Sequence, residues 1–253
     1  MHKFFAKPLF LGKKVEFLPQ CHSTNDELTN IVKNGNQPEG LILHTDHQLK
    51  GKGQRGNVWL DEPGKNILMS VYLKPKNLAV GIQYYLTLIA GLAVSDALGK
   101  YLDETIELKW PNDVYVNGRK ISGILIENNL RGTLIESSIV GIGLNLNQRG
   151  FSLPSATSIF LETNSVIERE ECMEEVVANL EKWYLKLNAG LLEEIRDTYH
   201  DRLMWKGEVH DFRSNNIEFE GVILGIDDLG RLEIEDQSGV KRCFNVKEVE
   251  FIN

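Results

Sequence analysis

Cysteines, histidine motifs and long apolar runs are scarce in this sequence, and each scarcity excludes a class of protein. Its 253 residues include three cysteines that are odd in number and far apart, so they predict neither a disulfide framework nor a C-x-x-C metal pair. The six histidines show no H-x-x-x-H or H-E-x-x-H pattern, which disfavours a zinc site. The longest apolar stretch, residues 84–94, contains a threonine and a glycine and falls short of the ~20 residues that a bilayer span needs. The sequence therefore predicts no transmembrane helix and no membrane association.

Excess positive charge and targeting signals are also lacking. With 28 basic and 36 acidic residues the formal net charge is -8, which opposes binding to a polyphosphate backbone and disfavours general DNA or RNA binding. The first residues scatter lysines among short apolar pieces and contain no unbroken apolar run with a small-residue cleavage site. We therefore expect a cytoplasmic protein. Its 42% apolar content is enough for a buried core, and its length predicts one or two domains.

Strand and helix patterns alternate over most of the chain. Apolar runs indicate strands, and apolar residues at i, i+3, i+4 and i+7 indicate helices. The expected strands span residues 15–18, 40–45, 66–73, 106–110, 114–116, 121–126 and 134–146, and the expected helices begin near residues 24, 82, 170 and 190. Asn117-Gly118 predicts a hairpin, because both turn residues must accept positive φ. This pattern predicts the α/β fold class, a mixed β-sheet with helices on one face.

The pattern changes after residue 204. Short apolar strands at residues 208–212, 217–226, 232–234 and 241–246 are separated by Asn-, Asp-, Ser- and Gly-containing turns. We therefore expect two packed parts, a first domain over residues 1–204 and a small all-β unit over residues 205–253.

The first expected helix starts at a group of polar residues. Thr24 and Glu27 have the spacing of a capping box, in which a hydroxyl and a carboxylate satisfy free backbone N–H groups. This context also explains Ser23 without a catalytic role.

A basic, glycine-rich segment at residues 48–57 is the first candidate for a ligand site. It contains three cations, three glycines and no acid. Glycines let backbone N–H groups approach a ligand closely and the cations supply charge, so the segment suits a phosphate or a carboxylate. It lacks the spacing of a Walker A loop. A solvated, flexible surface loop has the same composition, and both readings stay open from the residues alone.

Three further motifs place polar or flexible residues at strand ends. Residues 109–113 (Lys-Trp-Pro-Asn-Asp) combine a cation and two oxygen-bearing side chains where proline breaks a strand, although a tight turn is the plainer interpretation. Arg119 and Lys120 follow the hairpin and should face opposite sides of their strand, which leaves one of them for a cleft. Residues 141–145 (Gly-Ile-Gly-Leu-Asn) permit close approach of a flat ligand, or a packing contact.

Taken in order, these motifs make the chain resemble the biotin protein ligases, also called biotin–acetyl-CoA-carboxylase ligases or holocarboxylase synthetases. The resemblance covers most of the chain. The matching motifs are Ser-Thr-Asn at 23–25, Gly-Lys-Gly-Gln-Arg-Gly at 51–56 with Trp59, Lys-Trp-Pro-Asn-Asp at 109–113, Arg-Lys-x-x-Gly-Ile-Leu at 119–125 and Gly-x-Gly-x-Asn at 141–145. Each is modest alone, but the ordered set is highly specific. One departure is Gln54, where several bacterial members carry arginine.

The resemblance implies a two-step reaction. Biotin and ATP form biotinyl-5′-AMP and pyrophosphate, and a lysine of a biotin carboxyl carrier protein then displaces AMP. The catalytic cations implied are Lys120, which would bridge the biotin carboxylate and the α-phosphate, together with Lys52 and Arg55. The biotin-binding positions implied are Ser23, Thr24, Asn25, Gln48, Gly51, Gly53, Gly123, Leu125, Gly141 and Gly143. The ATP or adenylate positions implied are Trp59, Lys109, Asn112, Asn145 and Glu248. Mg²⁺ would accompany ATP, with Asp113 as a candidate ligand.

The resemblance also implies an architecture and a set of partners. The first domain would be a class II synthetase-like catalytic domain, and the C-terminal unit an SH3-like β-barrel. Because Ser23 has only 22 residues before it, a winged DNA-binding domain has no room, and a monofunctional ligase without DNA binding is expected. A homodimer formed through exposed strands of the main sheet stays open.

Two other functions remain as alternatives. A lipoate or octanoate ligase has a similar architecture, but its glycine-rich arginine motif and histidine-bearing strand are absent from this sequence. A non-catalytic sensor of biotin or nucleotide is the alternative outside enzymes. Biotin-dependent pyrophosphate exchange distinguishes the ligase from both.

Overall fold

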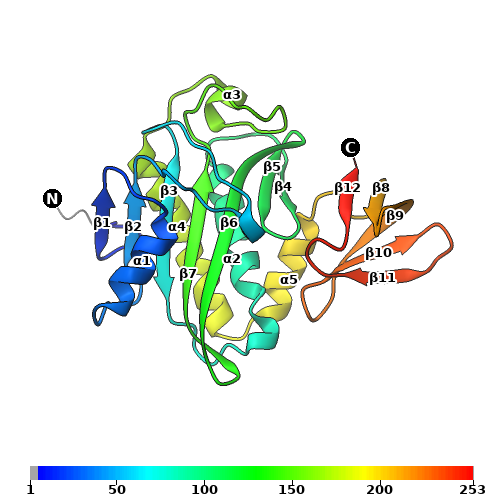
Figure 1. The fold of residues 1–253 in the computed structure, drawn as a ribbon, viewed down its shortest axis with the longest axis horizontal. Helices are drawn as coiled ribbons and strands as arrows, with labels where there is room; N and C mark the ends of the chain where they lie inside the picture. Colours follow the sequence, from blue (N-terminus) through cyan, green and yellow to red (C-terminus); the bar gives the residue numbers. More distant parts are fainter. Residues whose placement is uncertain (1–4, 253) are drawn as a thin grey trace.

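Two β-sheets, one large and one small, organise the chain in this computed structural model, which describes residues 5–252 apart from the side chain of Arg55 (Figure 1). The large sheet has seven strands in the order β1-β2-β3-β7-β6-β5-β4. Its strands are β1 (Val15–Leu18), β2 (Ile42–Thr45), β3 (Ile67–Leu73), β4 (Ile106–Lys109), β5 (Asp113–Val116), β6 (Arg119–Arg131) and β7 (Leu134–Leu144). The β1–β2 pair is parallel and the other pairs are antiparallel, so the sheet is mixed, which confirms the predicted α/β class.

Helices lie on both faces of the large sheet (Figure 1). They are α1 (Thr24–Lys33), α2 (Tyr85–Leu98), α3 (Ile159–Thr163), α4 (Arg169–Asn188) and α5 (Leu192–Asp201), with short 3-10 turns η1 (Gln54–Gly56) and η2 (Val80–Ile82). The prediction of helices on one face holds for α2, α4 and α5. Helix α1 differs, because its Leu28 packs in a separate small cluster with Leu41, Leu43 and Tyr72 on the other face.

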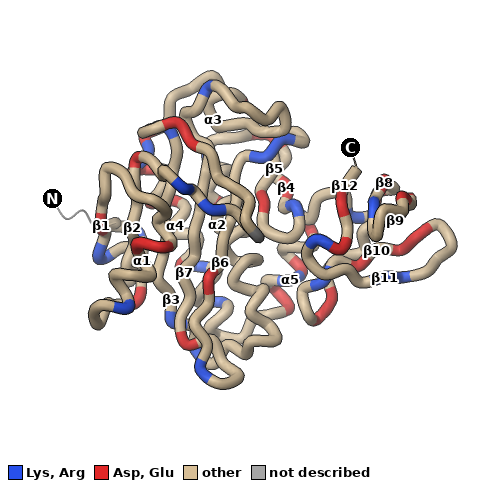
Figure 2. Tube along the Cα trace, viewed as in Figure 1, with Lys and Arg blue, Asp and Glu red and all other residues tan. Residues whose placement is uncertain are grey.

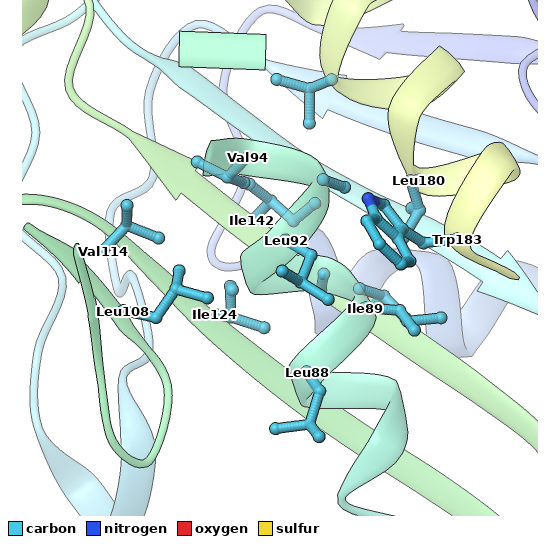
Figure 3. Packing of buried hydrophobic residues seen from close by; sticks show 14 of the residues in the cluster. Leu88, Ile89, Leu92, Val94, Leu108, Val114, Ile124, Ile142, Leu180 and Trp183 are labelled. Carbon is cyan, nitrogen blue, oxygen red and sulfur yellow. The ribbon is translucent and has the colours of Figure 1, made fainter. Parts of the chain in front are cut away.

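Helix α2 is the centre of the main hydrophobic core. Twelve of its fourteen residues are buried. Figure 3 shows its apolar side chains between those of the sheet strands and those of α4; the labelled residues are Leu88, Ile89, Leu92, Val94, Leu108, Val114, Ile124, Ile142, Leu180 and Trp183. The segment Val80–Leu98 is long and apolar enough to span a membrane, in contrast to the shorter stretch considered from the sequence. Because 61% of it is buried inside the protein, its role as the core helix accounts for that composition.

The small sheet is formed by the C-terminal part of the chain. Its strands, in the antiparallel order β11-β10-β9-β8-β12, are β8 (Val209–Ser214), β9 (Ile217–Ile226), β10 (Leu232–Asp236), β11 (Lys241–Phe244) and β12 (Glu250–Ile252). The sequence predicted the first four strands but not β12, which has only three residues. A run of three residues is too short for a periodicity argument.

The two sheets share one continuous core. Phe212 and Ile223 of the small sheet belong to the same buried cluster as the residues around α2. Trp110 Nε1 donates a hydrogen bond to the Gly230 carbonyl at 3.0 Å, which joins the β4–β5 turn to the small sheet. The predicted boundary at residue 204 stays a prediction, but the two parts pack against each other through this shared core.

Local turn chemistry is partly as expected. The turn residues Asn117 and Gly118 both have positive φ, 50° and 69°, and they join β5 to β6 as predicted. The predicted capping box is wrong. Ser23 is the N-cap of α1 but makes no side-chain capping bond, and the Thr24 hydroxyl faces Ser70 and Gln48 instead. That hydroxyl therefore belongs to a polar network with Ser70 and Gln48 and does not cap the helix.

Candidate active site

A cavity of about 650 Å³ lies over β6 and β7 of the large sheet. Segments far apart in sequence meet there. They are the start of α1, the basic, glycine-rich segment at residues 48–57 (the basic loop), the β4–β5 turn, and residues 246–251 of the C-terminal part. The predicted site residues that line it are Ser23, Thr24, Asn25, Gln48, Lys52, Gly53, Trp59, Lys109, Asn112, Asp113, Lys120, Gly123, Leu125, Gly141 and Gly143. The structure therefore brings together residues from all five sequence motifs.

Four predicted site residues are not among those that line the cavity. Gly51 lies in the basic loop, where its carbonyl accepts a hydrogen bond from the Trp59 amide at 2.9 Å, but it does not line the cavity. Asn145 is buried and does not line the cavity, and its side-chain Nδ2 donates to the Thr157 carbonyl at 2.9 Å. The carboxylate of Glu248 accepts hydrogen bonds from Asn245 in its own turn. The predicted role of the Arg55 side chain falls outside the described part of the structure.

The basic loop crosses one face of the sheet as an ordered hairpin. The amide of Gly53 donates to the Asn57 carbonyl at 2.7 Å, and Lys52 and Val58 form an antiparallel bridge. Lys52 pairs with Asp26 of α1, and the hydrogen bond to that carboxylate raises the pKa of the lysine. Figure 2 shows the positively charged segments of this loop in front of the sheet. The loop is therefore tied to α1 at the rim of the cavity.

Lys120 points into the cavity and Arg119 points away from it, as strand alternation predicts. The Lys120 ammonium is 2.7 Å from Asp113 Oδ1 and 5.8 Å from the centre of the Trp59 ring. Arg119 instead pairs with the buried carboxylate of Glu162 at 2.8 Å. The predicted division of the two cations between cleft and exterior is thus seen in the structure.

The backbone of Lys120 is held from outside the strand. The β5–β6 register shifts between Val114 and Tyr115, where Ile121 is the extra residue, and Lys120 next to it still pairs with Tyr115. Its amide donates to the Ser155 carbonyl at 2.7 Å, and its carbonyl accepts from the Thr157 amide at 2.8 Å. The backbone of Lys120, next to the bulge, is therefore held between β5 on one side and residues 155–157 on the other.

A buried polar network forms one wall of the cavity. Ser70 of β3 is fully buried, and its Oγ is hydrogen-bonded to Thr24 Oγ1 at 2.8 Å and to Asn25 Oδ1 at 2.6 Å. Gln48 Oε1 accepts from the Thr24 amide at 2.8 Å, and Asn25 Nδ2 donates to Glu127 at 2.8 Å. Such a network orients its hydroxyl and amide groups because each buried polar atom needs a partner.

Two glycines of β7 allow side chains to lie directly on the strand. A Cβ atom at Gly141 would be 2.4 Å from Asn25 Oδ1, and one at Gly143 would be 2.7 Å from the Trp59 ring. Neither contact is possible for a larger residue without displacement. The indole of Trp59 thus covers the floor of the cavity, and its Nε1 is buried with no hydrogen-bond partner in the described part of the chain.

The β4–β5 turn contributes a cation and a structural amide. Asn112 Nδ2 donates to the Ile124 carbonyl at 2.7 Å, so this side chain joins the turn to β6. Lys109 is half-buried, and burial lowers its pKa from the ordinary value. Burial also raises the pKa of the neighbouring Tyr115 to about 12, which keeps this phenol neutral at physiological pH. The peptide bond between Trp110 and Pro111 is cis.

The described part of the chain contains no cluster of residues suited to holding a metal ion. Among residues 5–252, no group of three or more histidine, cysteine or acidic residues is placed to hold a metal ion. Asp113, the predicted magnesium ligand, is already paired with Lys120.

Sequence reasoning missed several residues in and around the cavity, among them Ser70, Tyr115 and Phe251. Ser70 gave no signal because all seven residues of β3 are buried, so alternation does not mark its face. Tyr115 read as an ordinary strand residue, and Phe251 lies in the unpredicted strand β12. Only the tertiary arrangement brings Tyr115 and Phe251 to the cavity, and it places Ser70 against Thr24 and Asn25, which line the cavity.

Comparison with known proteins gives consistent matches. The sequence profile of the Biotin/lipoate A/B protein ligase family matches residues 17–145. The biotin–[acetyl-CoA-carboxylase] ligase of Paracoccus denitrificans is 33% identical over 230 residues, covering 88% of this chain and 94% of that protein. The bifunctional ligase/repressor BirA of Bacillus subtilis (strain 168) is 30% identical over 254 residues, covering 96% of this chain and 78% of that protein.

The similarity extends to a solved structure. A biotin protein ligase from Aquifex aeolicus in complex with biotin and ATP has a TM-score of 0.78 and 28% sequence identity to this chain. The match covers 95% of this chain and 99% of that one, so it includes both sheets. The chain belongs to the biotin/lipoate A/B protein ligase family.

Proposed function

We propose that this protein is a biotin–protein ligase, which activates biotin with ATP as biotinyl-5′-AMP and transfers it to a lysine of a biotin carboxyl carrier protein. The observation that carries the proposal is the composition of the cavity. Lysines from three separate segments, Lys52, Lys109 and Lys120, line the same cavity as the polar network around Thr24. Biotin has a hydrogen-bonding ureido ring at one end and a carboxylate at the other, so it needs both kinds of group.

The first step joins two anions, and cations must offset their repulsion. A biotin carboxylate oxygen attacks the α-phosphorus of ATP, the bond from that phosphorus to the bridging oxygen of the β-phosphate breaks, and pyrophosphate leaves. Lys120 is proposed to contact both the carboxylate and the α-phosphate, where negative charge accumulates in the transition state. Lys109 is proposed to contact the departing phosphates, and Lys52 to act from the loop after exchanging its Asp26 partner for the substrate.

The second step transfers biotin to the carrier. The neutral amine of a carrier lysine attacks the acyl carbon of the adenylate, the bond from that carbon to the phosphate oxygen breaks, and AMP leaves as the nitrogen loses a proton to solvent. The chain contributes position and water exclusion. The basic loop at residues 48–57 would cover the intermediate, because an acyl phosphate exposed to water is hydrolysed.

Magnesium is proposed to enter as part of the ATP substrate. Mg²⁺ usually keeps several waters and is held by substrate phosphates with one or two carboxylates. Asp113 fits that role because its carboxylate lines the cavity beside Lys120.

A lipoate ligase belongs to the same family, but the cavity favours biotin. The dithiolane ring of lipoate offers no strong hydrogen-bonding group. Thr24, Asn25 and Gln48 already bond to one another and to Ser70 and Glu127, but if lipoate replaced biotin their remaining donor and acceptor capacity would lose water without gaining a partner, which is costly. The ureido ring supplies both donors and acceptors to these residues.

The test is intact-mass measurement of an apo carrier domain after incubation with the protein and Mg-ATP. Biotin should add one biotinyl group, and a carrier whose acceptor lysine is replaced by arginine should gain none. Lipoate in place of biotin should leave the carrier mass unchanged. Transfer of lipoate but not biotin would contradict the proposal, as would biotin binding without biotin-dependent pyrophosphate exchange, which would indicate a sensor.

A further inference from the structure

Lys109 lies in a cage of aromatic rings rather than beside a carboxylate. Its Nζ atom is 4.9 Å from the ring centre of Tyr115, 4.9 Å from that of Phe251 and 5.9 Å from that of Trp205. It is also 3.5 Å from the Tyr115 hydroxyl. In the described part of the chain, no carboxylate lies within 4.0 Å of this ammonium, unlike those of Lys52 and Lys120.

The cage is built from both parts of the chain. Lys109 and Tyr115 belong to β4 and β5 of the large sheet, whereas Phe251 belongs to β12 of the small sheet. Phe251 is itself fixed, because its ring centre is 5.3 Å from Trp205 and 5.5 Å from Phe212, which is fully buried in the small sheet. The position of the Lys109 ammonium therefore depends on where the small sheet places the Phe251 ring.

The cage leaves the positive charge available to an anion. Ring faces stabilise a cation through their quadrupoles but do not neutralise its charge. Lys109, Phe251 and Lys120 all line the same cavity. Burial disfavours the charged lysine, which the lowered pKa reflects, so the aromatic contacts and an incoming anion both act to keep it protonated.

We infer that Phe251 is a positioning residue that holds the Lys109 ammonium for the polyphosphate of ATP. This inference rests on the proposed function and adds a role for the small sheet in the first step. Phe251 need not touch the nucleotide. It acts through Lys109. The long side chain of this lysine has many rotamers, and the cage restricts them before ATP binds, which lowers the entropy cost of binding.

The test compares three variants in biotin-dependent pyrophosphate exchange. Phe251→Leu removes the ring face but keeps an apolar side chain, and Phe251→Tyr keeps the ring. Phe244→Leu is the matched control, because Phe244 is a buried phenylalanine of the same small sheet that makes no contact with Lys109. The KM for ATP, the Kd for biotin measured without ATP, and the Tm are recorded for each.

The expected result is selective. Phe251→Leu should raise the KM for ATP about three- to tenfold and leave the Kd for biotin unchanged, since the loss of a cation–π contact is of that size. Phe251→Tyr should restore the KM for ATP, and Phe244→Leu should lower the Tm without changing that KM. If Phe251→Leu does not fold, Phe251→Met, which retains more apolar volume, takes its place.

Two results would overturn the inference. One is an unchanged KM for ATP in Phe251→Leu. The other is an equal rise in Phe244→Leu, which would mean that general destabilisation of the small sheet is the cause. Failure of the proposed function is a different result, because the unsubstituted protein would then show no biotin-dependent exchange at all.

Discussion

The Lys120 ammonium and the Asp113 carboxylate form an ion pair of 2.7 Å across the β5–β6 strand pair, inside the cavity. Asp113 is thereby paired with Lys120, the cation that we propose to bind the biotin carboxylate. An incoming anion must either share Lys120 with Asp113 or displace it. The pair is partly exposed, so its strength is reduced by solvent and salt.

Replacement of Asp113 by asparagine tests this competition. Asp113→Asn keeps the size of the side chain but removes its charge, so the Kd for biotin measured without ATP should fall about two- to fivefold. Isothermal titration gives this constant directly. Asp103→Asn, an exposed position outside the cavity, is the control. Weaker binding in Asp113→Asn would mean that Asp113 mainly orients Lys120 and does not compete for it.

Ser70 is expected to control biotin affinity without reaching the bulk of the cavity. Ser70→Ala removes the hydroxyl between Thr24 and Asn25, which lets both side chains rotate. Each buried hydrogen bond that is lost costs about 1 kcal/mol, so the Kd for biotin should rise at least about fivefold.

Ser138 offers a matched control for that change. It is an equally buried serine of the same sheet, but its hydroxyl has no hydrogen-bond partner among residues 5–252. Ser138→Ala should leave the Kd for biotin unchanged. Equal effects of the two substitutions would show that the network around Ser70 has no special role in binding.

Gly143 is expected to be essential for the position of Trp59. The Cβ atom added by Gly143→Ala would lie 2.7 Å from the indole, so the ring must move off the cavity floor. Fluorescence assigned to Trp59 by comparison with Trp59→Phe should shift toward the red, and pyrophosphate exchange should slow. Gly150→Ala adds a methyl group in open space and should change neither property. An unshifted emission in Gly143→Ala would contradict the packing described here.

His200 links stability to pH. Its Nε2 accepts a hydrogen bond from the Ile226 amide at 2.9 Å, which joins α5 to the small sheet, and burial holds the pKa of His200 below its usual 6.5. The unfolded chain therefore binds a proton that the folded chain resists, so the free energy of unfolding should fall as the pH decreases through 6.5 and below.

Urea unfolding at about pH 7.5 and about pH 5.5 measures that dependence. His200→Gln retains a hydrogen-bond acceptor but does not titrate, so the decrease between the two pH values should be smaller in this variant. The same decrease in both proteins would assign the pH dependence to other groups.

The sequence predicted the cations of the site better than their surroundings. Short motifs identify residue types and strand ends, so Lys109 and Lys120 could be placed at the cavity before the fold was known. Side-chain direction is set by tertiary packing, and therefore Asn145 and Glu248, although in the expected segments, turn toward Thr157 and Asn245.

The same limit applies to the fold. Alternation and helical periodicity located most elements, and Asn117-Gly118 fixed the hairpin through its backbone preference. Helix α1 was expected on the same face as the others, but nothing in its own sequence states which face of a distant sheet it will cover. Local capping preference at Thr24 was overridden by the polar network of the cavity.

The most direct test of the account is biotin-dependent pyrophosphate exchange in Lys120→Ala. Loss of a cation that acts on the α-phosphate should cost about 3 kcal/mol of transition-state stabilisation, hence slow exchange about a hundredfold. Arg131→Ala, which removes an exposed cation at the far end of the same strand, should exchange at the unsubstituted rate. Exchange in Lys120→Ala at the rate of Arg131→Ala would contradict the central role of Lys120 in joining biotin to ATP.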